Sequence, residues 1–269
     1  MRPYKFFLLT FLILLLLLFS LFGQNNAGAK QIALANSNIA LENNVFAIFN
    51  NPAGLGLVNS REFGIYYSPS PFGIKELSNA YLAYLEPSSF GNLSIGAYTY
   101  GFELYRENQL NLAYSTKFSD NIYLGVTTFY HSVHIDRYGN SGVLNIKIGG
   151  IFILNQNFSL GFSLHNPLRF NKTKIELPLI YLAGFSYTPI KNSSLNFAVV
   201  KEMDFPVSVK FGIEYEIIEY LQLRVGTQNE PDIYSGGIGI FYSFMNLNYA
   251  ITSHPELELS HQVDLIITF

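Results

Sequence analysis

The last eleven residues of the chain, 259–269, read Leu-Ser-His-Gln-Val-Asp-Leu-Ile-Ile-Thr-Phe. Successive side chains of a strand point to opposite faces, so this stretch has one apolar face and one mostly polar face, with Ile266 the exception. An apolar strand with a free edge invites aggregation, whereas the last strand of a membrane barrel pairs with the first. The C-terminus therefore predicts the closing strand of a transmembrane barrel. Its apolar face consists of Leu259, Val263, Leu265, Ile267 and Phe269.

The chain also ends on an aromatic residue. Leu265, Ile267 and Phe269 resemble the C-terminal signal that the bacterial barrel-assembly machinery reads. We therefore predict that machinery as a partner, outer-membrane lipid as the surroundings, and the bacterial outer membrane as the location.

The composition favours the same class of protein. The chain has 269 residues and a net charge of −3, and only 13% of its residues are charged, whereas soluble domains average about 25%. Hydrophobic residues make up 49%, yet no run of about eighteen apolar residues follows the N-terminus, so we expect no spanning helix there. Apolar composition without apolar runs is typical of a transmembrane β-barrel, because lipid-facing and lumen-facing residues alternate. A large soluble β-sandwich is the alternative, and the low charge disfavours it.

Two classes of site are excluded by composition. The chain has no cysteine, which rules out disulfides and thiolate metal sites. Its near-neutral charge argues against nucleic-acid binding, which requires a basic face.

Residues 1–23 predict a signal peptide. Arg2 and Lys5 supply a positive start, and an apolar run follows over residues 6–22. Cleavage after Gly23 and cleavage after Ala29 both fit the small residues of this region, and an uncleaved anchor is the alternative. Each of these readings predicts export.

Residues 24–61 predict an N-terminal plug or periplasmic segment. The stretch lacks clean strand alternation and breaks at Asn50-Asn51-Pro52-Ala53-Gly54-Leu55-Gly56, where proline and two glycines favour a turn. We expect short helical or irregular pieces inside or under a barrel. The turn residues with a predicted structural or gating role are Asn51, Pro52, Gly54 and Gly56.

Residues 62–269 predict the barrel itself. The period is two nearly everywhere, as where Phe63, Ile65 and Tyr67 alternate with Gly64 and Tyr66. We expect the apolar set to face lipid and the small or polar set to face the lumen. The pattern predicts an all-β fold, an antiparallel barrel of about fourteen strands. The strands are expected to start near Arg61, Asn79, Gly91, Gln109, Asn121, Val143, Asn157, Leu179, Ser194, Pro206, Tyr220, Ile233, Met245 and Leu259.

The connections are expected to alternate in length. Tight turns, expected to be periplasmic, are predicted at 119–121, 155–157, 218–220 and 244–246. Longer connections, expected to be extracellular, are predicted at 135–142, 167–178 and 254–258. An even number of strands places both termini on the periplasmic side.

Candidate chemistry is sparse, and we expect neither an enzyme nor a cofactor. His131 and His134 lie three apart, which places them on opposite faces of a strand, where they cannot bind one metal ion. A set of Ser253, His254, Glu256 and His261 lacks the glycines of a nucleophile elbow. The glycines of 236–239 lie in a β-periodic stretch without a following helix or lysine, so they predict close packing against the plug rather than a phosphate loop.

Four charged residues are predicted to face the lumen. We expect them to pair across the wall, and ion selectivity is the alternative role. They are Lys147, Lys210, Glu214 and Arg224.

Several stretches resemble the PorV/PorQ-type outer-membrane proteins, within the wider FadL-like barrels. The Asn-Pro-Ala-Gly-Leu sequence at 51–55 is the most specific match. The others are Gly28-Ala29, Ile39-Ala40-Leu41, Val45–Asn50, Leu160–Asn166, Phe211–Tyr215, Leu223–Gly226, Tyr234–Gly239, His254–Leu257 and Ser260-His261. If Gly28-Ala29 belongs to the mature chain, cleavage after Gly23 is favoured.

The resemblance implies a fourteen-stranded barrel with an N-terminal plug. PorV-like members serve type IX secretion, so the main functional prediction is protein docking in or beside a secretion or surface-attachment system. Its expected partners are secretion-system subunits or secreted cargo. FadL-like members pass hydrophobic molecules, so the alternative prediction is a transporter with hydrophobic small molecules as partners.

Overall fold

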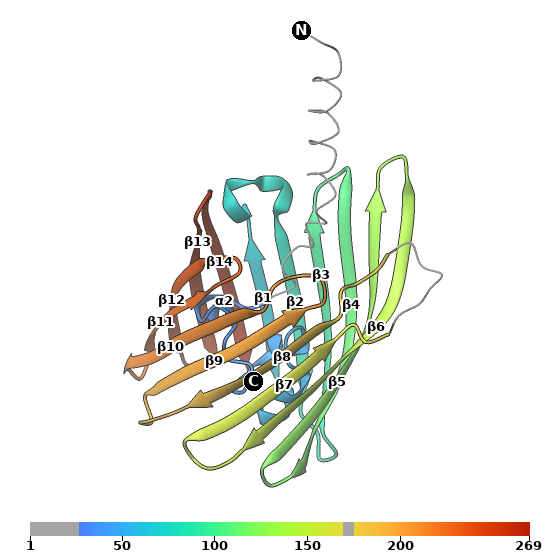
Figure 1. Ribbon diagram of the computed structural model, residues 1–269. Helices are drawn as coiled ribbons and strands as arrows, with labels where there is room; N and C mark the ends of the chain where they lie inside the picture. Colours follow the sequence, from blue (N-terminus) through green and yellow to red (C-terminus); the bar gives the residue numbers. More distant parts are fainter. Residues whose placement is uncertain (1–26, 169–174) are drawn as a thin grey trace.

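The computed structural model describes residues 27–168 and 175–269, and over these residues the chain forms one closed antiparallel barrel (Figure 1). Each strand pairs with its neighbours in sequence, and the first pairs with the last. This confirms the predicted fold class. No helix in the described part of the chain is long and apolar enough to cross a membrane.

The strands follow the predicted order. Every predicted start lies within about four residues of an observed one, and β4 and β6 begin earlier than expected. The strands are β1 Glu62–Ser68, β2 Asn79–Glu86, β3 Asn92–Gly101, β4 Tyr105–Ser119, β5 Ile122–Ile135, β6 Gly139–Ile153, β7 Phe158–His165, β8 Ile180–Tyr187, β9 Ser193–Glu202, β10 Ser208–Ile218, β11 Leu221–Gln228, β12 Ile233–Tyr242, β13 Met245–His254 and β14 Leu257–Thr268.

The barrel is closed by the pairing of β1 with β14. Ile65 lies opposite Leu265 and Phe63 opposite Ile267, and the Phe269 amide donates to the Arg61 carbonyl at 3.0 Å. The prediction that the C-terminal strand pairs with the strand from Arg61 is therefore confirmed. The assembly role of Leu265, Ile267 and Phe269 stays a prediction.

The two faces of the wall have the predicted character. In β1, Ile65 and Tyr67 are 45% and 47% exposed, whereas Tyr66 is 2% exposed. In β14, the outward Leu259 is 48% exposed and the inward Asp264 only 1%. Ile266, the exception in the polar face, is buried against the residues that fill the lumen.

Strand length varies around the wall. β4, β5 and β6 have 15, 14 and 15 residues, whereas β1 has 7 and β2 has 8. A tilted spanning strand requires about 9–11 residues. The β3–β4 and β5–β6 hairpins reach the top of the view in Figure 1, at the barrel end opposite the C-terminus.

Two predicted connections are wrong in length. Residues 135–142 and 254–258 were expected to be long loops, but β6 begins at Gly139 and β14 at Leu257, so both connections are tight. Arg137 and Gly139 take positive φ angles of 64° and 90°, which suits a short hairpin turn. The expectation failed because we placed the strand ends where the alternation of apolar residues stops. The strands remain hydrogen-bonded to each other for several residues beyond that point. The predicted long connection at 167–178 lies between β7 and β8, and part of it is outside the described residues.

The N-terminal segment lies inside the ring of strands, where it appears blue in Figure 1. It contains the short helix α2, Ala29–Ala33, and two 3-10 turns, η1, Val45–Ile48, and η2, Pro52–Leu57. Two more 3-10 turns, η3 Pro71–Gly73 and η4 Lys75–Leu77, belong to the β1–β2 connection. The predicted signal peptide, residues 1–23, lies outside the described residues. We call residues 27–58 the plug.

Candidate functional site: the plug and its seat

The predicted turn residues form η2 at the base of the plug. Asn51 caps it, because its side-chain oxygen accepts from the Ala53 amide at 3.2 Å, and Pro52 occupies the first turn, where no amide donor is needed. Gly54 lies so close to the Glu42 carbonyl that a Cβ would approach it to 2.4 Å. A Cβ on Gly56 would come within 2.9 Å of the Ser115 hydroxyl. These positions require small side chains because the plug packs there against itself and the wall.

Glu42 fastens the turn from within the plug. Its carboxylate accepts from the Asn51 amide and from the Asn50 side chain, both at 2.8 Å, and Glu42 is only 2% exposed. The Asn51 side chain in turn donates to the Ile39 carbonyl at 2.8 Å. Burial raises the pKa of Glu42 to about 8, against the opposing effect of these bonds and of the Lys147 and Lys30 charges.

Glycines of the barrel wall make the seat for this turn. A Cβ on Gly125 of β5 would lie 2.3 Å from the Pro52 carbonyl carbon, and one on Gly149 of β6 would lie 1.9 Å from the Asn51 side-chain oxygen. A Cβ on Gly161 of β7 would lie 2.5 Å from the Ile39 carbonyl oxygen. Only glycine permits backbone to approach this closely.

The carbonyls at the top of the plug accept hydrogen bonds from the wall. Thr127 donates to the Ile48 carbonyl at 3.0 Å, and the Lys147 ammonium donates to the Phe49 carbonyl. The Asn50 carbonyl lies 3.2 Å from the Ser163 hydroxyl and 2.6 Å from His165 Nε2. Strands β5, β6 and β7 thus hold the plug through polar contacts.

A second polar anchor holds α2 on the far side of the lumen. The Ala29 amide donates to Asp264 of β14 at 2.5 Å, and the Lys30 ammonium lies 3.4 Å from Glu214 of β10. The Arg224 side chain, which is fully buried, donates to Glu214 at 2.6 Å and to Asn248 at 2.7 Å. Asn248 continues the network to Asp264 at 2.7 Å.

The third side of the plug is apolar and aromatic. Phe46 and Phe49 pack against the inward faces of β1, β2 and β3. Phe49 meets Tyr81 edge-on at 4.9 Å between ring centroids, and Tyr66 meets Tyr81 at 5.3 Å. A cross-wall bond at the start of η1 joins the Val45 amide to Glu62 at 2.8 Å.

The structure gives mixed outcomes for the other predicted lumen residues. Arg224 pairs with Glu214 as expected, but Lys147 and Lys210 have no carboxylate partner within 4.0 Å among the described residues, so that part of the prediction is wrong. Lys147 binds a plug carbonyl instead. Gly237 contacts the plug as predicted, since a Cβ there would lie 2.6 Å from the Ala33 side chain. Sequence reasoning missed Glu42 and the seat glycines Gly125 and Gly149.

The histidines His131, His134, His254 and His261 lie apart from the plug turn. His131 is buried in the lumen and His134 is exposed outside, as their spacing predicts. His254 and Glu256 are at the β13–β14 turn, and His261 binds the Tyr249 hydroxyl on the outer surface at 2.6 Å.

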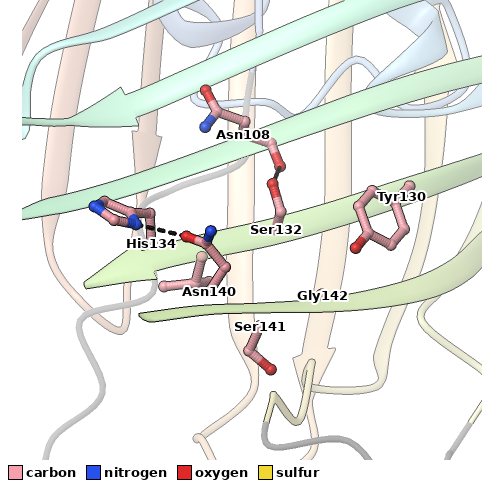
Figure 2. A pocket seen from close by; sticks show the side chains of 8 residues that line it. Asn108, Tyr130, Ser132, His134, Asn140, Ser141 and Gly142 are labelled. Carbon is pink, nitrogen blue, oxygen red and sulfur yellow. Dashed lines mark hydrogen bonds between the residues drawn. The ribbon is translucent and has the colours of Figure 1, made fainter. Parts of the chain in front are cut away.

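A pocket also occurs on the outer surface of the wall, where β4, β5 and β6 approach the end that holds the β5–β6 turn (Figure 2). Within it, His134 Nδ1 lies 2.5 Å from the Asn140 side-chain oxygen, and Ser132 donates to the Asn108 carbonyl at 3.2 Å. This pocket does not open toward the plug turn, because Asn108, Ser132 and His134 alternate with inward residues of the same strands.

Comparison with solved structures identifies the same architecture. The fold resembles that of TodX. The crystal structure of this Pseudomonas putida toluene transporter matches with a TM-score of 0.66 at 12% sequence identity, over 92% of this chain and 98% of that one. A Pseudomonas aeruginosa FadL homologue matches with a TM-score of 0.63 at 11% identity, over 90% and 98%. Omp33, an Acinetobacter baumannii outer-membrane protein, matches with a TM-score of 0.54 at 9% identity, over 80% and 100%.

No protein-family model matches the chain, and no curated protein matches it in sequence. At these identities, the likeness to TodX and to the FadL homologue is one of fold. It matches the barrel architecture that the sequence resemblance implies, whereas membership of the FadL-like or the PorV/PorQ-type proteins stays a prediction.

Proposed function

We propose that this protein is an outer-membrane barrel that passes hydrophobic small molecules, with the plug as its gate. The observation that carries the proposal is the uneven attachment of the plug. Strands β5–β7 and β10–β14 hold it through hydrogen bonds and ion pairs. Strands β1–β3 hydrogen-bond it at the two ends of their contact, through Glu62 to the Val45 amide and through Asn92 to the Leu55 and Val58 carbonyls, and pack apolar and aromatic side chains against it in between.

The uneven attachment suggests a route along β1–β3. An apolar solute there can replace the contacts that Phe46 and Phe49 make with Tyr66 and Tyr81 without leaving buried donors unpaired. On the polar sides the same replacement would leave Thr127 and Lys147 without their carbonyl partners, which is costly. The likeness to TodX, a toluene transporter by name, supports this choice of solute class.

A reversible lock on the plug tests the proposal. The chain has no cysteine, and the Asn51 side chain lies against the Cα of Gly149, so Asn51→Cys combined with Gly149→Cys places two thiols at the seat. Cells that express this variant are given a radiolabelled monoaromatic hydrocarbon before and after reduction, with each single variant as the matched control. We expect uptake by the double variant to rise on reduction and uptake by the single variants not to change. Equal uptake before and after reduction of a confirmed disulfide overturns the gate.

The proposal includes the location. We propose that the termini face the periplasm, that residues 1–23 direct export, and that the barrel-assembly machinery inserts the chain. Outer-membrane fractionation and heat-modifiable gel mobility test this, and recovery as a soluble periplasmic protein contradicts it.

Docking of secreted proteins, the main prediction from the PorV-like resemblance, is the second candidate. Its support is the sequence resemblance at 51–55 and elsewhere. The tight turns at 136–138 and 255–256 count against it, because they leave little loop surface for cargo. Co-purification of secretion-system subunits with the barrel, together with no hydrocarbon uptake, would favour docking over transport.

A further inference from the structure

The outward face of β4, β5 and β6 changes character within one step of the ladder. Leu110, Tyr130 and Leu144 lie side by side in one row and are 64%, 51% and 50% exposed. The next row toward the barrel end contains Asn108, Ser132 and Gly142. The change marks the edge of the apolar belt on this flank, with Tyr130 in the position typical of aromatic residues at a membrane boundary.

The rows beyond this edge present hydrogen-bond donors around the pocket of Figure 2. The Asn140 side-chain oxygen can only accept, so His134 Nδ1 is the donor of their bond, which leaves the Asn140 amide nitrogen available as a donor to a ligand. The Tyr130 ring lies over Gly142, where a Cβ would come within 2.1 Å of the phenol oxygen. Glycine thus keeps the pocket floor open beside the tyrosine.

Arg106 adds a cation to this group. It lies directly opposite His134 in the ladder and is exposed. In the part of the chain that the structure describes, no carboxylate lies within 4.0 Å of it. Two exposed acidic residues, Glu103 and Asp136, lie in the turns beyond this row, and Asp136 is 3.5 Å from Arg137.

We infer that this flank binds the phosphate of an outer-leaflet glycolipid. The inference rests on the membrane placement proposed above, and does not depend on transport. A guanidinium and neutral amide donors suit a phosphate, and the adjacent row of Leu110, Tyr130 and Leu144 lies where acyl chains would follow. One molecule with a phosphorylated head and apolar tails therefore matches both rows.

The test measures retained glycolipid directly. The full barrel is reconstituted with bisphosphorylated lipid A or with its dephosphorylated form, and the bound fraction is measured by native mass spectrometry. The variants are Arg106→Gln and, as the matched control at the other end of the same strand, Lys117→Gln. Heat-modifiable mobility checks that each variant is folded.

We expect wild type to retain the phosphorylated form, and Arg106→Gln to weaken retention about tenfold, the effect of losing roughly one charged hydrogen bond. Lys117→Gln should bind like wild type. Equal retention of the two lipid A forms by wild type overturns the inference without the use of any variant. Displacement of the lipid by inorganic phosphate alone at low concentration would also overturn it, because the tails would then contribute nothing. Hydrocarbon uptake is measured separately, so failure of the gate leaves this result unaffected.

Discussion

Glu42 is the single side chain on which the plug turn most depends. It joins Asn50 and Asn51 to the preceding segment, and it does so in full burial. Glu42→Ala would leave the Asn51 amide and the Asn50 side-chain amide without this partner, at about 1–3 kcal/mol for each buried donor. We expect faster hydrogen exchange of residues 45–57 with the barrel strands unchanged. Asn43→Ala, at an exposed neighbour, is the control, and unchanged exchange in Glu42→Ala would contradict this role.

The same residue predicts a pH dependence. Burial raises the pKa of Glu42 to about 8, above the value of about 4.3 expected in an unfolded chain. Its contribution to plug docking is therefore fully present below the unfolded value and is lost as the pH rises through about 8. We expect protease cleavage within the plug to increase progressively between about pH 5 and pH 8, and to change little above that. Glu42→Gln, which does not titrate, should flatten this profile.

At the residue scale, the sequence predicts only part of the site. Proline and glycine chemistry correctly places a turn at Asn51–Gly56. Glu42 looks like an ordinary polar residue in sequence, because its two amide donors come from residues that only the folded plug brings near. A two-residue period assigns Gly125 and Gly149 to the lumen face, but it does not say at which height the plug touches that face.

Among the elements, α2 depends on the network around Arg224. Arg224→Ala would leave Glu214 and Asn248 buried with one partner fewer, and breaking a buried ion pair costs about 3–5 kcal/mol. We expect a lower free energy of unfolding in urea for the detergent-solubilised barrel. Arg137→Ala, whose side chain is 90% exposed, should change it by less than about 0.5 kcal/mol. Equal effects of the two substitutions would rule out an anchoring role for Arg224.

The closing strand provides a separate prediction about assembly. Phe269 is 62% exposed at the end of β14, so Phe269→Ser removes little packing from the folded barrel. If the terminal aromatic residue is read by the assembly machinery, the amount of protein in the outer membrane should fall while the unfolding free energy of purified protein stays the same. Tyr242→Ser, at another highly exposed aromatic position, serves as control. Normal outer-membrane levels of Phe269→Ser would argue against the signal.

The strands themselves were predictable because one face of each meets an apolar environment. The predicted strand ends are wrong where the alternation of apolar and polar residues stops before the strand does. The outer ends of β4 and β6 carry Asn108 and Asn140 on their outward faces, so apolar alternation starts later than the strands do.

For the whole molecule, the closure of the barrel can be predicted from the sequence, but the contacts between the plug and the inner wall cannot. The amphipathic C-terminal strand and the even number of strands predict a sealed ring, and β1 pairs with β14 as expected. The division of the lumen into two hydrogen-bonded sides and one aromatic side depends on contacts such as Ala29 with Asp264, which are 235 positions apart. Such contacts have no local signature. The resemblance at 51–55 indicates that a plug exists, but not which flank it leaves loosely held.

The unequal strand lengths have a consequence for the surrounding bilayer. β1 and β2, with 7 and 8 residues, are shorter than the roughly 9–11 that a spanning strand requires, and so are β7, β8 and β11 with 8 each, whereas β4 to β6 exceed it. In the outer membrane proposed above, lipids beside the short strands would thin to match them, at a modest cost for each ångström of mismatch. A neighbouring barrel with an equally low wall would share that thinned patch and reduce its cost. Crowded membranes would therefore tend to bring such neighbours to the β1–β2 and β7–β8 flanks, without any specific contact between the proteins.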